Sequence, residues 1–273
     1  IVLTNKTVIA PSALAGASKL KFISVIATGT NNVDLKEADR LGIQVSNAVA
    51  YGTPSIVQHT ISLILTLSTH MPAYIDDVRR GMWQKSSNFS LLHHPIQEIA
   101  GKTLGVIGYG ILGRSVAAAC EALGMQILVA ERKGAPVRGN RMDFDELICQ
   151  VDYLSLHCPL VDTTENLINE KTLAQMKPSS FLINTARGAL VDSSALLTAL
   201  ENKTIAGAAI DVLMEEPPLA REPLTSARLP NLIVTPHNAW GAIESRQRLI
   251  LQMHENIVGF LSGSAPRRVT GYP

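Results

Sequence analysis

Short runs of apolar residues alternate with amphipathic stretches along most of the chain, and this alternation limits the fold more than any other feature. Each run holds about four to six apolar positions and ends at Gly, Pro or a polar residue, which is typical of buried strands. Alternating strands and helices build a parallel sheet with helices on both faces, so the expected fold class is α/β. The expected strands are FISVIATG, TLGVIGYG, QILVAE, VDYLSLHC, SFLINTA, AGAAIDV and LIVTPH.

The length of 273 residues indicates two domains rather than a single core. The first part of the chain has strands of its own (VIAP, FISVIATG and IQVSNA), followed by a helical stretch that Pro72 would kink. We expect two doubly wound, Rossmann-like domains: a substrate domain of residues 1–80 plus 243–273, and a dinucleotide-binding domain of residues 81–242. Because the chain begins IVLTNK, inside an expected strand, the first domain is expected to be truncated at its N terminus.

The composition excludes several classes of partner. A net charge of +1 gives no general attraction to nucleic acid or to an anionic membrane, and 4% aromatic residues do not supply a platform for stacking bases. No apolar run reaches the ~18 residues that a membrane helix needs. Cys120, Cys149 and Cys158 form no C-x-x-C and are interpreted as reduced thiols. We therefore expect a cytoplasmic protein whose partners include neither nucleic acid nor a membrane.

Gly108, Gly110 and Gly113 form a G-x-G-x-x-G between the expected strand TLGVIG and the expected helix RSVAAACEALG. A dinucleotide site requires this context: Gly108 makes the tight turn, Gly110 allows close approach of a pyrophosphate, and Gly113 lets the helix pack on the strand. The phosphates would lie against the N–H groups and the positive dipole end of the helix. A tight turn without a ligand is the less favoured alternative.

Glu131 ends the next expected strand, where this fold places an acid that accepts hydrogen bonds from the adenosine ribose. A carboxylate there also repels a 2′-phosphate, which favours NAD. Arg132 and Lys133 follow directly and would favour NADP if they turned inward, although adjacent cations usually lie in solvent. We predict NAD and leave NADP open through Arg132 and Lys133.

Polar side chains stand at the ends of three later strands. The first segment, INTARG, contains Arg187. The second, AIDVLMEEP, contains Asp211, Glu215 and Glu216, and the third, VTPHNAW, contains His237. Ligands bind at the carboxyl ends of parallel strands in this architecture. A histidine that donates a proton, a carboxylate that orients it and an arginine that binds an anion are the groups needed to reduce a 2-keto acid. Each also has a structural alternative as a cap, a loop charge or a buried histidine.

Other dehydrogenase designs fit the sequence poorly. No tyrosine is followed by lysine four residues later, as the short-chain design requires, and three scattered cysteines do not make the thiolate-rich site of a zinc enzyme. His93 and His94, beside Pro95 in a polar loop, are interpreted as a solvated face, so no metal site is predicted. Trp240 fits a cap over the substrate pocket or a core aromatic equally well.

The ordered motifs GYGILG, HCPL, INTARGALVD, AAIDVLMEEP and TPHNAW resemble the D-isomer-specific 2-hydroxyacid dehydrogenase family. The resemblance covers nearly the whole chain, since ATGTNNVDL near the start and RRGMW before the polar loop fit the same pattern. Within the family, ATGTNNVD, HCPL and HNAW most resemble hydroxypyruvate reductases (glycerate dehydrogenases).

The resemblance implies hydride transfer between NAD(H) and a small anionic 2-keto or 2-hydroxy acid, either hydroxypyruvate/D-glycerate or glyoxylate/glycolate. It implies Arg187, Glu216 and His237 as the catalytic set, with Glu216 preferred to Glu215 because the family's acid directly precedes a proline. A homodimer is expected from the family and from an arm-like loop around residues 84–98. The alternative is a non-catalytic NAD-binding regulator, like the corepressors that share this fold.

The resemblance also implies three groups of binding residues. They are Ile111, Leu112 and Glu131 for the adenosine half of the cofactor, Thr185, Ala186 and Asp211 for the nicotinamide half, and the backbone of Thr28 and Gly29 with Lys6 close by for the substrate carboxylate.

Overall fold

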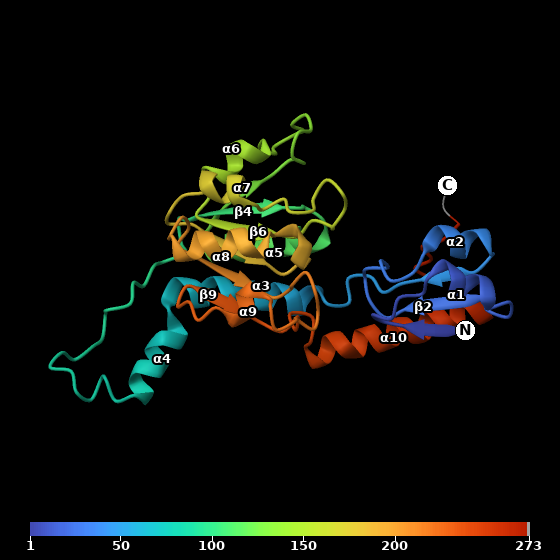
Figure 1. Ribbon diagram of the computed structural model, residues 1–273, viewed down its shortest axis with the longest axis horizontal. Coiled ribbons are helices and arrows are strands. Elements are labelled where there is room, and N and C mark those ends of the chain that lie inside the picture. Colours follow the sequence, from blue (N-terminus) through green and yellow to red (C-terminus); the bar gives the residue numbers. More distant parts are fainter. Residues whose placement is uncertain (272–273) are drawn as a thin grey trace. The chain divides into compact units, whose positions relative to one another are not determined.

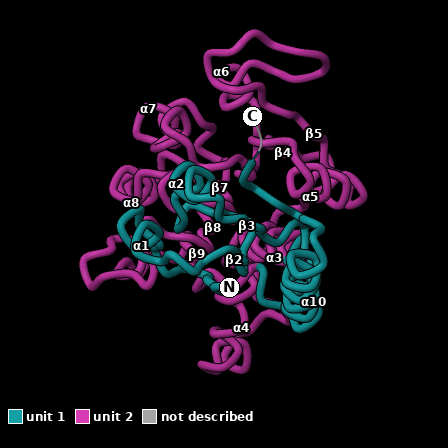
Figure 2. Tube along the Cα trace, turned by 90° about the vertical axis from the view of Figure 1, so that its right-hand side faces the viewer, with its two compact units in different colours: residues 1–55, 240–273 teal, residues 56–239 magenta. Residues whose placement is uncertain are grey.

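The computed structural model describes residues 1–271. The chain divides into two compact units (Figure 2): unit 1 contains Ile1–Ser55 and the segment from Trp240 onwards, and unit 2 contains Ile56–Ala239. The boundary that the sequence suggests, between residues 80 and 81, lies inside unit 2. By their contacts, residues 56–80 belong with the strands expected for dinucleotide binding.

Unit 1 contains a three-stranded parallel sheet in the order β1-β2-β3. The expected strand VIAP is wrong: Ile9 makes only an isolated bridge to Val33, and Pro11 begins a helix. Proline suits the first helical turn because its fixed φ is already helical and its missing N–H is not needed there. The elements of unit 1 are β1 (Val2–Thr4), α1 (Pro11–Gly16), β2 (Phe22–Val25), α2 (Leu35–Arg40), β3 (Gln44–Ser46) and α10 (Ile243–Leu261).

The helix α10 completes the core of unit 1, although it is far from the strands in sequence. Phe22 of β2 stacks on Phe260 of α10, with ring centroids 4.6 Å apart. The buried Asn256 donates a hydrogen bond to the carbonyl oxygen of Asn47 at 2.9 Å. These contacts fix α10 against the sheet of unit 1.

Unit 2 contains a six-stranded parallel sheet in the order β5-β4-β6-β7-β8-β9. The neighbouring strands β4 and β6 are labelled in Figure 1. The chain passes from β4 outward to β5 and returns across β4 to β6, so the strand order reverses between β4 and β6. This confirms the predicted α/β, doubly wound fold, in which ligands bind at the reversal and at the carboxyl ends of the strands. The strands are β4 (Thr103–Ile107), β5 (Gln126–Val129), β6 (Tyr153–Leu156), β7 (Phe181–Asn184), β8 (Gly207–Ile210) and β9 (Leu232–Val234). The helices after β4 are α5 (Ile111–Ala122), α6 (Phe144–Ile148), α7 (Glu170–Gln175), η1 (Gly188–Leu190), α8 (Ser193–Glu201) and α9 (Pro223–Ser226).

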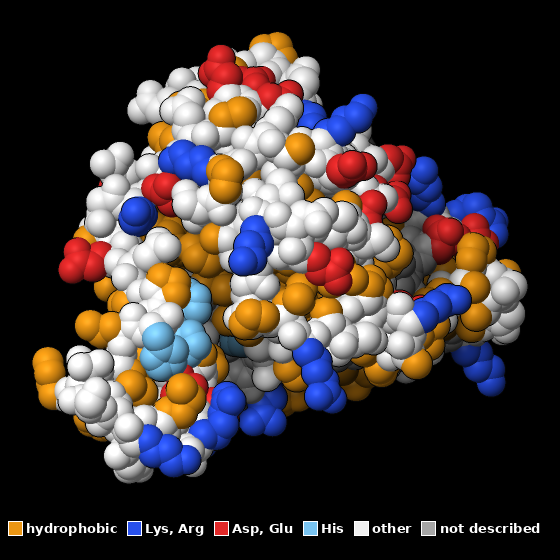
Figure 3. Space-filling model, turned by 60° about the vertical axis from the view of Figure 1, so that its left-hand side comes forward, with side chains coloured by type: hydrophobic (Ala, Val, Ile, Leu, Met, Phe, Trp, Pro, Cys, Tyr) orange, Lys and Arg blue, Asp and Glu red, His pale blue; other side chains and the backbone are white. Residues whose placement is uncertain are grey.

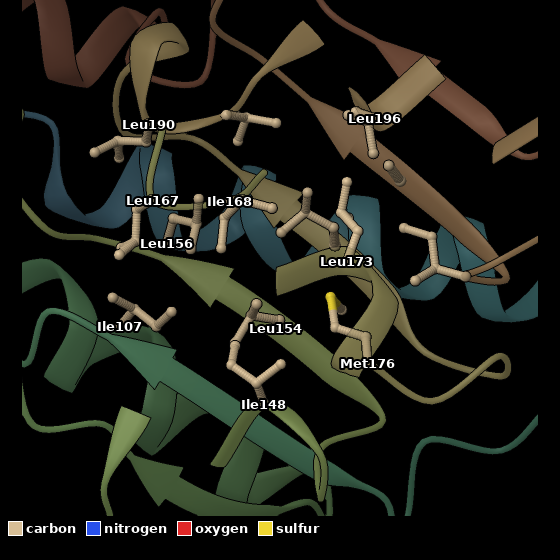
Figure 4. Close-up of a cluster of buried hydrophobic side chains, with 14 of the residues drawn as sticks. Ile107, Ile148, Leu154, Leu156, Leu167, Ile168, Leu173, Met176, Leu190 and Leu196 are labelled. Atoms are coloured by element: carbon tan, nitrogen blue, oxygen red, sulfur yellow. The ribbon is translucent and has the colours of Figure 1, made fainter. Parts of the chain in front are cut away.

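The sheet of unit 2 is buried on both faces. In β6, Leu154 and Leu156 belong to one core cluster, together with Leu173 of α7 and Leu196 of α8 (Figure 4). Tyr153 of the same strand belongs to a second cluster. Alternate residues of a strand point to opposite faces, so burial of both faces produces the continuous apolar runs seen in the sequence.

The helical stretch around Pro72 consists of two helices, α3 (Thr53–Thr69) and α4 (Met71–Arg79). His70 separates them with a left-handed φ of 51°. Pro72 lacks the N–H that would continue the helical hydrogen bonds, which explains the break. Ile64 of α3 is buried in the same cluster as Val106 of β4, so this helix covers a face of the sheet of unit 2.

The three cysteines are unpaired but lie in different environments. Cys120 is buried in α5, Cys158 is half-buried after β6, and Cys149 is exposed next to α6. Burial raises the pKa of the Cys120 and Cys158 thiols to about 11 in each case. Both therefore remain protonated at neutral pH.

Candidate active site

The glycine turn joins β4 to α5 at the reversal of strand order. Gly108 has a φ of 91°, which favours glycine, and a Cβ there would lie 2.4 Å from the backbone nitrogen of Cys158. A Cβ on Gly113 would lie 2.0 Å from the carbonyl oxygen of Gly108. In contrast, a Cβ on Gly110 would meet nothing within 4 Å. The first and third glycines are needed for packing, and the second faces open space.

The N terminus of α5 fits the pyrophosphate of a dinucleotide. No side chain caps this helix at Gly110, so no cap competes for the N–H groups of Ile111 and Leu112. These groups and the positive end of the helix dipole lie beside the open space at Gly110, where they can receive an anion. The side chain of Ile111 is half exposed and available to a ligand.

Glu131 follows β5 and is buried, but its carboxylate already has several partners. Arg138 donates two hydrogen bonds to it, at 2.9 and 3.0 Å, and Arg141 donates a third at 3.2 Å. The backbone N–H of Arg132 adds a fourth at 2.9 Å. The bonds from Arg138, together with that from Arg132, lower the pKa of Glu131 to about 2 despite its burial. The acid expected to meet the ribose is thus also the anchor of two guanidinium groups.

Arg132 and Lys133, the two cations considered from the sequence, do not contact Glu131 with their side chains. Lys133 lies 3.5 Å from a carboxylate oxygen of Asp145 and sits over the ring of Phe144. The guanidinium of Arg138, 67% exposed, lies beside Glu131 instead. Positive charge therefore surrounds this acid, but it comes from the loop farther along the chain.

The end of β6 lies across the reversal from the glycine turn. The backbone N–H of His157 donates to the carbonyl oxygen of Ile107 at 2.7 Å, and its ring Nε2 lies 2.9 Å from the hydroxyl of Ser155. Burial lowers the pKa of His157 to about 4, so its ring is neutral at pH 7. His157 lies in HCPL, which carries the family resemblance, but it was not among the residues expected at the site.

Arg187, Asp211 and His237 follow the neighbouring strands β7, β8 and β9, so they lie along one edge of the sheet. Backbone hydrogen bonding between these segments continues past the ends of the strands. The N–H of His237 donates to the carbonyl oxygen of Asp211 at 2.8 Å. His237 also has a left-handed φ of 50°, which is uncommon for a residue with a side chain. The backbone of the candidate proton donor is therefore held by the sheet itself.

His237 and Glu216 are in direct contact. Nδ1 of His237 lies 2.5 Å from one carboxylate oxygen of Glu216, and the other oxygen accepts a hydrogen bond from the N–H of Leu213 at 3.0 Å. The two side chains are 28% and 26% exposed, so a substrate can reach them. Because Nδ1 faces the carboxylate, Nε2 is the ring nitrogen that can serve a substrate.

Asp211 is buried, and its carboxylate holds the loop that carries His237. The hydroxyl of Thr235 donates to it at 2.6 Å, and the backbone N–H groups of Asn238 and Ala239 each donate at 3.0 Å. Asp211 was expected at the nicotinamide half of the cofactor, and Thr235 was not among the expected site residues. The motif VTPHNAW contains Thr235 two residues before His237, but its partner is distant in sequence.

Arg187 precedes η1 and is half-buried, and its Nη1 donates to the carbonyl oxygen of Ala186 at 2.6 Å. A Cβ on Gly188 would lie 1.9 Å from the backbone of Leu213. This close approach brings the loop of Arg187 against the loop of Glu216. Thr185 is buried, with its hydroxyl 3.2 Å from that of Thr60 on α3.

The candidate substrate-binding residues of unit 1 also follow strands. Thr28 and Gly29 come shortly after β2, and Lys6 follows β1. The carbonyl oxygen of Thr28 accepts a hydrogen bond from the side chain of Asn47 at 2.7 Å, which fixes this turn. The three residues thus share the carboxyl edge of one small parallel sheet.

Comparison with known proteins identifies the family. The NAD binding domain of the D-isomer specific 2-hydroxyacid dehydrogenases matches residues 61–239. The chain belongs to this family. A putative 2-hydroxyacid dehydrogenase of Haemophilus influenzae is 42% identical over 264 residues, which cover 96% of this chain and 84% of the relative. The glycerate dehydrogenase of Methylorubrum extorquens is 43% identical, with 96% and 83% covered.

A solved structure of an acyclic imino acid reductase, in complex with NADPH and D-arginine, superposes on this 2-hydroxyacid dehydrogenase with a TM-score of 0.86 and 29% identity. The match covers 98% of this chain and 85% of that one. The predicted family, the NAD cofactor and the class of NAD-dependent 2-hydroxyacid oxidoreductase are confirmed, and the non-catalytic alternative is not favoured. Among residues 1–271, no helix is both long and apolar enough to cross a membrane.

Proposed function

We propose that this 2-hydroxyacid dehydrogenase reduces hydroxypyruvate to D-glycerate or glyoxylate to glycolate, with NADH as the preferred cofactor. The observation that carries the proposal is the contact of 2.5 Å between His237 and Glu216, on the sheet edge that also bears Arg187. The similarity to a glycerate dehydrogenase supports the choice of a short, hydroxylated keto acid. We assign residues 56–239 to dinucleotide binding and the rest of the chain to substrate binding.

The proposed chemistry assigns one task to each side chain. A nicotinamide bound at the ends of the strands of unit 2 would supply the hydride that C2 of the keto acid receives. The guanidinium of Arg187 binds the carboxylate and polarises the ketone, which draws electrons away from C2. His237 donates a proton from Nε2 to the ketone oxygen. In the oxidising direction the same nitrogen accepts the proton.

Glu216 is proposed as the residue that keeps His237 in the required state. A carboxylate at Nδ1 retains a proton there, so Nε2 is the nitrogen that gains and loses the transferred proton. Asp211 is proposed to act through the backbone of residues 237–239, because its carboxylate binds two N–H groups of that segment.

The remaining assignments extend the proposal to the binding residues. Ile111, Leu112 and Glu131 are proposed to contact the adenosine half of the cofactor, and Thr185 and Ala186 the nicotinamide half. The backbone of Thr28 and Gly29, with Lys6, is proposed to receive the substrate carboxylate. A cytoplasmic location is also proposed, and the three unpaired cysteines support it because a reducing compartment keeps thiols free.

The experiment is a steady-state assay of the full-length protein. Oxidation of NADH and NADPH would be followed with hydroxypyruvate, glyoxylate and a larger keto acid such as 2-ketoisocaproate. The proposal requires the highest kcat/KM for hydroxypyruvate or glyoxylate with NADH. Binding of NADH without oxidation by any keto acid would support a regulator instead, and preference for the larger acid would show that the substrate is wrong.

We also propose a homodimer in which the arm, defined as residues 84–98, and the outer faces of α3 and α4 meet a second copy. Large apolar side chains are exposed there, including Phe89 at 92% and Leu92 at 76%. Apolar surface of this extent usually marks an interface. Light scattering after gel filtration should give twice the chain mass. Phe89→Ser with Leu92→Ser should give monomers, whereas Leu261→Ser, at an exposed site on α10, should not. A monomeric wild-type protein would overturn the proposal.

A further inference from the structure

Two adjacent histidines of the arm converge on one aspartate of α4. The Nε2 atoms of His93 and His94 lie 2.7 and 2.8 Å from the same oxygen, Oδ2 of Asp77. The three atoms all lie within 4.8 Å of one another, and no other group of three such ligands occurs in the described residues. Histidine side chains gather on the face drawn in Figure 3. The sequence interpretation of these histidines as a solvated face is therefore incomplete.

Tyr74 holds the two histidines in place. Its hydroxyl donates to the carbonyl oxygen of His94 at 2.6 Å and accepts from the N–H of the same residue at 3.1 Å. Its ring meets both imidazoles edge-on, with centroids 5.7 and 4.9 Å away. Tyr74 and Asp77 are three residues apart on α4 and so lie on one face of the helix. The ligand atoms are thus positioned by a helix and a fixed turn.

The chemistry and exposure of the cluster suit a cation. Asp77 is buried, and its Oδ2 faces the Nε2 atoms of both imidazoles. Within one chain, the side chains of His93 and His94 are 40% and 30% exposed, so solvent reaches the buried oxygen where a second copy does not cover the arm.

We propose that Asp77, His93 and His94 bind one divalent transition-metal ion, with zinc the best match. Two imidazole nitrogens, one carboxylate oxygen and a water form the four-coordinate shell that zinc favours. Bonds of about 2.0–2.2 Å place neighbouring ligand atoms roughly 3.4 Å apart in a tetrahedron. The two contacts with Asp77 must then lengthen by less than about 1 Å, which rotation of the side chains can supply. Each neutral imidazole would present its Nε2 lone pair and carry its proton at Nδ1.

The proposed metal site lies apart from the proposed catalytic residues, and it affects stability instead of the reaction. Its ligands come from α4 and the arm, whereas Arg187, Glu216 and His237 lie in the segments that follow β7, β8 and β9. An ion would link residues 93 and 94 to α4 and hold the arm against it. Metal binding therefore stabilises this part of unit 2, and its test does not depend on the identity of the substrate.

The test is binding of zinc to the full-length, untagged protein after treatment with a chelator. Calorimetry and equilibrium dialysis should give one site per chain, with affinity reduced at least about tenfold in Asp77→Asn and His93→Gln. Tyr74→Phe should weaken binding by about tenfold, because it frees the backbone of a ligand. His254→Gln, at an exposed histidine of α10, is the matched control and should bind like the wild type.

X-ray absorption of the zinc complex gives a second readout that needs no variant. A shell of nitrogen and oxygen at about 2.0–2.1 Å with imidazole scattering is expected. A sulfur shell would place the ion on a cysteine and overturn the proposal. Absence of a stoichiometric site, or equal affinity in wild type and His93→Gln, would do the same.

Discussion

The two glutamates at the ends of unit 2's sheet show how one residue type takes on different tasks. Glu131, beside β5, is buried and accepts hydrogen bonds from two guanidinium groups and a backbone N–H. Glu216, near the ends of β8 and β9, is partly exposed and shares its oxygens between Leu213 and His237. The carboxylate of Glu131 therefore binds arginines, which always carry a charge. The carboxylate of Glu216 binds a histidine, a residue type that can be neutral or charged.

Under the proposed function, this difference separates a cofactor side of the sheet, at Glu131, from a reaction side, at Glu216. Arginine stays charged at every accessible pH, so Glu131 has partners of fixed charge. Histidine gains and loses a proton near neutral pH, so a carboxylate beside His237 can take part in proton transfer. Four predictions test this separation, beginning with the largest effect.

The reaction side should control turnover. His237→Ala removes the proposed proton donor and should lower kcat by about 10²–10⁴-fold, and Glu216→Gln should lower it by about 10²-fold because the ring loses its charged partner. The KM for NADH should change by no more than about twofold in either variant, as steady-state kinetics would measure. A normal kcat in His237→Ala would remove the distinction between the two sides.

Adding a methyl group to the glycine turn should have a different effect at each of two glycines. Gly110→Ala projects a methyl group into open space, so the protein should fold normally and bind NADH about 10²-fold more weakly. Gly113→Ala places a methyl group 2.0 Å from the Gly108 carbonyl, and overpacking costs about 1–3 kcal/mol or more of stability. Thermal melting and NADH titration separate the outcomes. Unchanged NADH affinity in Gly110→Ala would contradict the pyrophosphate assignment.

The guanidinium groups around Glu131 should set the cofactor preference. Arg138→Ala should raise the KM for NADPH about tenfold more than that for NADH, because an arginine can pair with a 2′-phosphate. Lys133→Ala is the control, since Lys133 already pairs with Asp145. If Lys133→Ala changes the NADH/NADPH ratio and Arg138→Ala does not, the sequence-based assignment to Lys133 is the better one.

The smallest effect concerns stability. The pKa of Glu131 falls from 4.5 to about 2 on folding, so its ionised form stabilises the protein above pH 4.5. This contribution is lost as the pH falls from 4.5 towards 2. Glu131→Gln should lower the urea midpoint by about 0.5 M at pH 7, and the difference from wild type should shrink below pH 4.5. Glu121→Gln, at an exposed position of α5, should show no such trend.

The features that the sequence predicted correctly are those that depend on neighbouring residues. A buried parallel strand must be apolar throughout, so the strands of unit 2 were visible as runs. The helix break at Pro72 follows from one missing N–H. VIAP was misread as a strand because three apolar residues fit a strand and also the approach to a helix that begins at Pro11.

Contacts between residues that are far apart in the chain could not be predicted from the sequence. Nothing local indicates that Ile64 of α3 packs with Val106 of β4, so the expected boundary at residue 80 separated that helix from its core. Arg138 and Arg141 lie in a loop without periodicity, and their contact with Glu131 depends on how that loop folds back. The same applies to Asp77 and the two histidines of the arm.

The unequal burial of the cysteines determines which thiol reacts with electrophilic reagents. Thiolates, not thiols, react with alkylating reagents, and a pKa of about 11 leaves Cys120 and Cys158 with very little thiolate at pH 7. Cys149 is exposed next to α6. A maleimide dye should therefore label one position, four residues from Asp145. A fluorophore there would report on the α6 region without any engineered cysteine.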